Sequence, residues 1–162
     1  MRFPSLLATL AFPALAGAAL AQQPASPDPK ELFAVMSANV MRISPSLEYD
    51  RWNANVGLWE TRLKHARKPD AATLTAMRES FKTMSDIVDQ IRGPEEKGRW
   101  DANRALWQAW FDDAGDPSPA TKAQMRTTMA ALRANLSQIT AEGEAARWRA
   151  NLQLWAGTLA GK

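Results

Sequence analysis

The residues of this chain that could take part in binding chemistry recur in a nine-residue motif, R-W-x-A-N-x-x-L-W. Its three copies begin at Arg51, Arg99 and Arg147 and are spaced 48 residues apart without a gap. Six of the seven tryptophans lie in these copies, and Trp110 lies outside them. The motif combines guanidinium, amide and indole groups, which together suit a sugar, a peptide or an aromatic small molecule.

Two interpretations of the motif follow from its spacing. On a helix its two tryptophans share one face, so stacked copies could bury the indoles while each asparagine bridges to a neighbouring helix. Alternatively, the same side chains could line a groove. Arg104 interrupts the apolar stripe of the second copy and Arg149 adds a charge in the third, and these departures would bring part of this face to solvent. Repeated tryptophan at helical spacing favours packing. The candidate ligand- or partner-binding residues are Arg51, Trp52, Asn55, Trp59, Arg99, Trp100, Asn103, Arg104, Trp107, Arg147, Trp148, Asn151 and Trp155.

The segment before each motif also repeats at 48 residues and has the pattern of an amphipathic helix. In the second unit its apolar residues are spaced by three and four, as in a heptad stripe. Asp28, Asp70 and Ser118 are predicted N-caps. Breaks are expected at 44–46, 93–94 and 140–143 within the units, and at 68–69 and 114–117 between them. The apolar stripe of the second unit consists of Leu74, Met77, Phe81, Met84, Val88 and Ile91.

The predicted fold is therefore all-α, with three tandem 48-residue helical hairpins. Their six helices, of roughly 15–22 residues each, form a short α-solenoid or a compact bundle. The helical repeat domain spans 29–162, in units 22–68, 69–116 and 117–162.

The N-terminal segment 1–21 has the pattern of a secretory signal peptide. Arg2 precedes an apolar stretch that ends in the small-residue site Ala19-Leu20-Ala21, so cleavage is predicted after Ala21. We expect residues 22–28 to be a disordered polar tail and the mature protein to be periplasmic or secreted. No later segment has the composition of a membrane span.

Composition narrows the classes of function. The chain has no cysteine, one histidine (His65) and a net charge of +3, which argues against a zinc–thiolate site, a histidine-rich metal centre and nucleic-acid binding. No known catalytic motif is present, and glutamates such as Glu48 lie at surface-like positions. The acidic loop at Asp112, Asp113 and Asp116 lacks the order of an EF-hand and is interpreted as a solvated turn.

The expectation is a non-enzymatic exported scaffold or interaction module that binds an unidentified protein or envelope polymer. The alternative is a small-ligand-binding protein with a cleft between repeats lined by tryptophan, arginine and asparagine. No catalytic residue, metal or cofactor is expected in either case. A third option is an enzyme of unrecognised type, which turnover screening would have to support.

Overall fold

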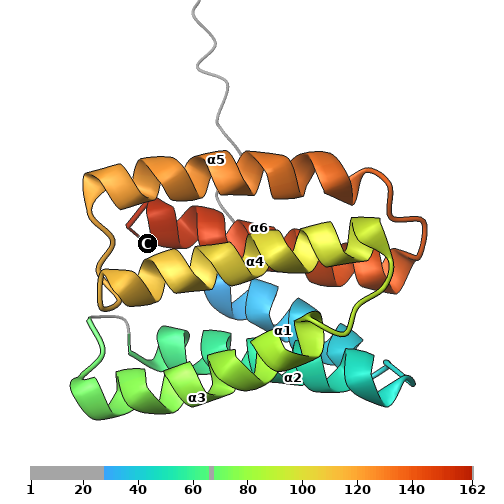
Figure 1. Ribbon diagram of the computed structural model, residues 1–162, viewed down its shortest axis with the longest axis horizontal. Helices are drawn as coiled ribbons and strands as arrows, with labels where there is room; N and C mark the ends of the chain where they lie inside the picture. The colour runs from blue at the N-terminus through green and yellow to red at the C-terminus, as the bar shows by residue number, and fades with distance from the viewer. Residues whose placement is uncertain (1–27, 66–67, 162) are drawn as a thin grey trace, which may run out of the picture.

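The computed structural model describes residues 28–65 and 68–161, and these residues form six helices and no strand (Figure 1). The predicted signal peptide and nearly all of the predicted tail lie outside the described residues. No helix in the described ranges is long and apolar enough to cross a membrane. The helices are α1 (Pro29–Val40), α2 (Ser46–Lys64), α3 (Ala71–Val88), α4 (Pro94–Asp112), α5 (Pro119–Leu136) and α6 (Glu142–Leu159).

The first helix of each unit begins at its predicted cap. Asp28 Oδ1 accepts from the backbone N–H of Lys30 at 3.0 Å, Asp70 Oδ1 from Thr73 at 2.7 Å, and the Ser118 hydroxyl from Thr121 at 3.2 Å. The backbone N–H of Thr73 holds the pKa of Asp70 below its usual value. With 12 residues, α1 is shorter than predicted, because its capped start lies later in its unit than the starts of α3 and α5.

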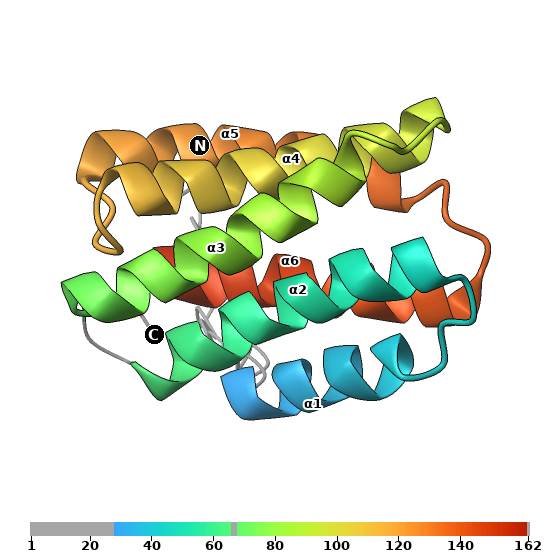
Figure 2. The ribbon, with the colours of Figure 1, turned by 60° about the horizontal axis from the view of Figure 1, so that its bottom comes forward.

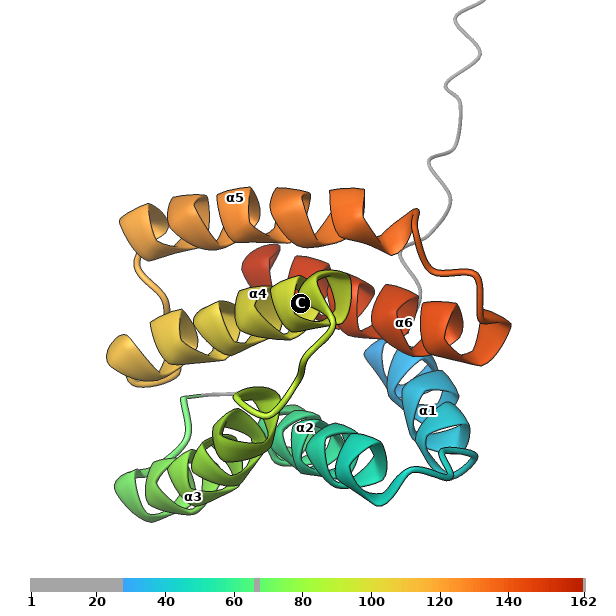
Figure 3. The ribbon, with the colours of Figure 1, turned by 45° about the vertical axis from the view of Figure 1, so that its right-hand side comes forward.

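The six helices close into a ring rather than an open solenoid. Each helix packs against its neighbours in the chain, and α6 also packs against α1 (Figure 3). The closest pairs join successive units, namely α2 with α3, α4 with α5, and α6 with α1, whereas the two helices within one unit pack less closely. Figure 2 shows α3 lying between α2 and α4. The fold is therefore a compact six-helix bundle.

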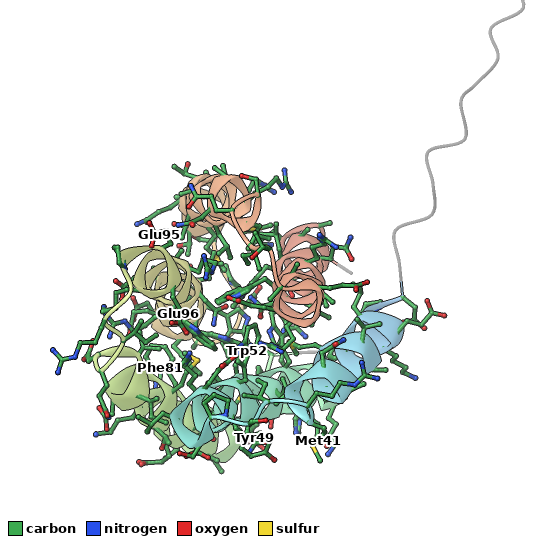
Figure 4. All side chains as sticks on the ribbon, turned by 90° about the vertical axis from the view of Figure 1, so that its right-hand side faces the viewer. Met41, Tyr49, Trp52, Phe81, Glu95 and Glu96 are labelled. Carbon is green, nitrogen blue, oxygen red and sulfur yellow. The ribbon has the colours of Figure 1, made fainter. Side chains whose placement is uncertain are left out.

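The motif helices α2, α4 and α6 surround a common axis. Equivalent tryptophans from all three helices touch one another, so the three helices are parallel and at the same height. Yet no Cα atoms of two motif helices approach within 8 Å in the described ranges, so side chains fill the space between them. Seen end on, Trp52 lies near the centre of the bundle, whereas Met41 and Tyr49 lie at its edge (Figure 4).

Candidate functional site

The tryptophans of the motif form two triangular clusters across the axis. Within each triangle the ring centroids are 4.6–5.0 Å apart, and the planes are steeply inclined, in the edge-to-face geometry that aromatic rings prefer. All six indoles are at most 1% exposed. The upper triangle, toward the N-terminal ends of the motif helices, consists of Trp52, Trp100 and Trp148. The lower triangle consists of Trp59, Trp107 and Trp155.

The three motif asparagines lie between these triangles and form a closed ring of hydrogen bonds. Asn55 Nδ2 donates to Asn151 Oδ1 at 3.1 Å, Asn151 Nδ2 to Asn103 Oδ1 at 2.9 Å, and Asn103 Nδ2 to Asn55 Oδ1 at 3.0 Å. Each amide is 0% exposed. Because every member is both donor and acceptor, the ring compensates three amides for their loss of water.

The lower tryptophan triangle completes this polar ring. Trp59 Nε1 donates to Asn151 Oδ1 at 2.7 Å, and Trp107 and Trp155 make the equivalent bonds to Asn55 and Asn103 at 2.9 and 3.1 Å. Each amide oxygen therefore accepts two hydrogen bonds, which uses both of its lone pairs. The asparagine of the motif and the tryptophan four residues after it therefore belong to one hydrogen-bonded network, in which each tryptophan bonds to the asparagine of another motif helix.

The motif arginines form a second ring, with three glutamates, near the N-terminal ends of the motif helices. Arg99 Nη2 lies 2.9 Å from Glu144 Oε1, and Arg147 Nη2 lies 2.8 Å from Glu48 Oε1. Arg51 pairs with Glu96 in the same way. Each bridge joins one motif helix to another, so the three bridges connect the motif helices in a cycle.

The guanidinium groups of this ring also contact the upper tryptophan triangle. The guanidinium carbon of Arg51 lies 5.6 Å from the ring centroid of Trp100, and that of Arg147 lies 5.4 Å from Trp52. The three arginines are 6–7% exposed. Burial lowers the pKa of Arg147, and the carboxylates of Glu48 and Glu144 act in the opposite direction.

The glutamates of this ring are partners of the motif arginines that the sequence interpretation did not pair with them. Glu48 was assigned to a surface-like position, but it pairs with Arg147 and its side chain is 27% exposed. The assignment is wrong because it considered each glutamate singly. Glu48, Glu96 and Glu144 are spaced by 48 residues, three positions before each motif arginine, and this periodicity would have identified them.

The structure therefore places twelve of the thirteen candidate residues in the core, where they contact one another. Arg104 is the exception. It is half-buried between α3 and α4 and pairs with Asp89 at 2.7 Å and Asp101 at 2.9 Å. The burial of the other twelve residues supports packing as the role of the motif. Differences between the units that could matter for binding therefore lie on the outside of the bundle.

The remaining polar features have local structural roles. Asp113 Oδ2 accepts from the backbone N–H of Ser118 at 2.7 Å in the α4–α5 loop, and His65 is exposed at the end of α2.

Trp110, which lies outside the motif, is fully buried. It packs under this loop at Gly115, whose φ of +83° and close approach to Trp110 leave no room for a side chain. Among the described residues, no group of three or more acidic or histidine side chains could hold a metal ion.

No protein-family model, curated protein or solved structure is significantly similar to the chain.

Proposed function

We propose that the protein is an exported, non-enzymatic interaction module that binds a protein partner through its first hairpin. The buried motif supports this proposal indirectly. Its polar groups bind one another in the core, so a surface that binds a partner must lie on the outside of the bundle, where the units differ in sequence. The single observation that carries the proposal is the distribution of exposed apolar side chains.

The exposed large hydrophobic residues of the described chain all lie in the first hairpin. Met41 is 73% exposed, Leu47 is 49% exposed and Val35 is 46% exposed. Met41 and Leu47 flank the α1–α2 loop, and Met41 Sδ lies 4.0 Å from the hydroxyl of Tyr49. Exposed methionine suits an adaptable protein-binding surface because its side chain is flexible and polarizable.

The other two units show that the fold does not need these apolar groups. The residues equivalent to Met41 are Asp89 and Ser137, and those equivalent to Leu47 are Glu95 and Gly143. The second and third hairpins therefore have polar or small residues where the first has hydrophobic ones. Packing within the bundle does not account for exposed hydrophobic residues in the first hairpin alone, whereas binding of a partner does.

The test is site-specific photo-cross-linking in the cells that produce the protein. A photoreactive residue at Met41 should give a discrete adduct, and the control at Glu95, the exposed equivalent of Leu47 in the second unit, should give none. The substitution Leu47→Glu, which introduces the residue of the second unit, should reduce the adduct while helical content stays unchanged. Equal cross-linking at both positions or none would contradict the proposal, and a ladder of adducts would indicate an envelope polymer instead of a protein.

Export is tested separately by the N-terminus of the mature chain. Cleavage after Ala21 predicts that cell fractionation recovers a periplasmic or secreted protein that begins at Gln22. A cytoplasmic protein that retains residues 1–21 would contradict this part of the proposal.

A further inference from the structure

The grooves between the two helices of each unit are equivalent in the repeat but differ in chemistry. In the second unit, Arg104 lies in the α3–α4 groove and bridges Asp89 and Asp101. Lys97 joins the same network, 2.6 Å from Asp101. Two cations and two carboxylates thus balance one another's charge between these helices.

The α5–α6 groove of the third unit has lost every member of this network. Leu152 stands in place of Arg104, Ser137 in place of Asp89, Arg149 in place of Asp101 and Ala145 in place of Lys97. These replacements leave an open groove of about 360 Å³. It is lined by Arg133, Leu136, Ser137, Arg149, Leu152, Gln153 and Ala156.

The two arginines give this groove an uncompensated positive charge. In the second unit the positions of Arg133 and Arg149 are taken by Ser85 and Asp101. Neither arginine has an acidic partner within 4.0 Å or a side-chain hydrogen bond in residues 28–65 and 68–161, and both are exposed. An anion bound here would take the place that the carboxylates of Asp89 and Asp101 occupy in the second unit.

The groove continues into a second hollow, of about 180 Å³, which shares Ala156. The equivalent space in the second unit contains Phe81 and Phe111, whose ring centroids are 5.4 Å apart. Their counterparts in the third unit are the smaller Met129 and Leu159, which line the hollow together with Arg126. The Arg126 guanidinium donates to the backbone carbonyl of Leu159 at 3.4 Å at the edge of this hollow. From Arg149 to Leu159, where α6 ends, the two hollows extend along the helix for about 15 Å at 1.5 Å per residue.

We propose that the α5–α6 groove binds a small amphipathic carboxylate. The carboxylate pairs with the guanidinium groups of Arg133 and Arg149, whose planar donors suit bidentate binding of an anion. The apolar chain lies along Leu136 and Leu152 and extends toward the hollow at Met129 and Leu159.

The dimensions favour a small molecule over a protein in this groove. A volume of about 360 Å³ lies in the range of small-ligand pockets. A stable protein interface buries about 800 Å² on each partner, which a recessed groove lined by seven residues does not offer. None of the exposed large hydrophobic residues of the described chain lies on α5 or α6. The site is thus separate from the surface proposed for a protein partner and does not depend on it.

The test is calorimetric titration of the mature chain with dodecanoate below its micelle concentration. We expect saturable binding of one molecule per chain. Dodecyltrimethylammonium, which has the same chain and a cationic head group, and butanoate, which has the carboxylate but a short chain, should each bind at least about tenfold more weakly. No saturable binding of dodecanoate, or equal binding of the cationic amphiphile, would overturn the proposal.

Substitutions that introduce residues of the second unit at the equivalent positions of the third unit test whether dodecanoate binds in the α5–α6 groove. The variant S137D/R149D/L152R supplies the missing ion-pair network and should abolish dodecanoate binding. The single variants Arg149→Asp and Arg133→Ser should each weaken binding at least about tenfold and provide the test if the triple variant does not fold. Arg92→Asp, at an exposed arginine in the α3–α4 loop, is the charge-matched control and should bind normally. Unchanged binding by both single variants would overturn the assignment.

The same variants separate this proposal from the one for the first hairpin. Leu47→Glu should leave dodecanoate binding unchanged, and Arg149→Asp should leave the adduct at position 41 unchanged. Loss of dodecanoate binding in Leu47→Glu with helical content retained would contradict two separate sites.

Discussion

At the scale of single residues, the asparagine ring turns three costly groups into a specific connection among three helices. A buried amide without partners is unfavourable, but here each oxygen accepts from one asparagine and one tryptophan. The remaining donor of Asn55 points at Met36 Sδ, 3.8 Å away, and that of Asn103 at Met84 Sδ, 3.9 Å away. Leu132 occupies the third methionine position, so the ring is close to threefold symmetric but not identical in its parts.

The substitution Asn103→Leu tests this ring. It removes the acceptor of Asn151 Nδ2 and Trp155 Nε1, so two buried donors lose a partner. At about 1–3 kcal/mol for each of the two, the free energy of unfolding should fall by about 2–6 kcal/mol. Denaturant unfolding measures this loss. Asn53→Leu, at an exposed position on α2, is the matched control, and an equal midpoint for the two variants would contradict the role of the ring.

The sequence predicted that the motif asparagines are buried bridging amides, but not what they bridge to. Periodicity shows that Asn55, Asn103 and Asn151 occupy equivalent places in their units. It does not show how far each unit is rotated from the last, and that rotation decides whether three equivalent residues meet. Their bonds to one another therefore became visible only in the structure.

At the scale of the helices, the arginine–glutamate ring sets the relative height of the three motif helices. Each bridge joins an arginine on one helix to a glutamate near the start of another, where the helix dipole also favours a negative charge. The guanidinium groups of Arg51 and Arg147 also lie over indoles of the upper tryptophan triangle. A shift of one motif helix along its axis would break two bridges at once.

We expect Glu144→Gln to lower the free energy of unfolding by about 1–2 kcal/mol, because the buried Arg99 loses its carboxylate. The matched control is Glu142→Gln, at an exposed position in the first turn of the same helix. The effect should persist in concentrated salt, because the Arg99 side chain is only 8% exposed. Equal stability of the two variants in chemical denaturation would show that the ring contributes nothing measurable.

The helices themselves could be predicted from the sequence with few errors. Their starts depend on local chemistry, and Asp28, Asp70 and Ser118 all act as the predicted caps. The closest helix pairs were not predictable in this way. The spacing predicts hairpins within each unit, whereas α2 with α3 and α6 with α1 pack more closely, because pairing depends on the crossing geometry of apolar faces that the repeat does not define.

At the scale of the whole molecule, the six helices form a closed ring. The last helix, α6, packs against α1 in the way that the second helix of each earlier unit packs against the first helix of the next unit. The pair of α6 and α1 is equivalent to the pairs of α2 with α3 and α4 with α5, although the chain does not connect it. In an open solenoid, the terminal helices carry a polar outer face. Here α1 buries Leu32, Met36 and Val40, and α6 is buried over much of its length, which is consistent with closure.

Closure predicts that the chain can be circularly permuted between units. A chain that runs from Asp70 to Gly161 and continues through a linker of about ten residues into Asp28–His65 should fold with the same helical content. Its free energy of unfolding should lie within about 1–2 kcal/mol of the parent's value. Deletion of α1, by contrast, should expose the apolar face of α6 and prevent cooperative unfolding. A permuted chain that is unfolded or aggregated would contradict the equivalence of the three helix pairs.

The most direct test of the central claim, that the repeated motif closes on itself as the core, is hydrogen exchange of the tryptophan indole protons by NMR. The Nε1 protons of Trp59, Trp107 and Trp155, which bond to the asparagine ring, are expected to exchange only when the whole domain unfolds. Their exchange should accelerate together in Asn103→Leu. Rapid exchange of these three protons in a folded, helical sample would contradict the closed core and return the motif to consideration as a solvent-facing binding stripe.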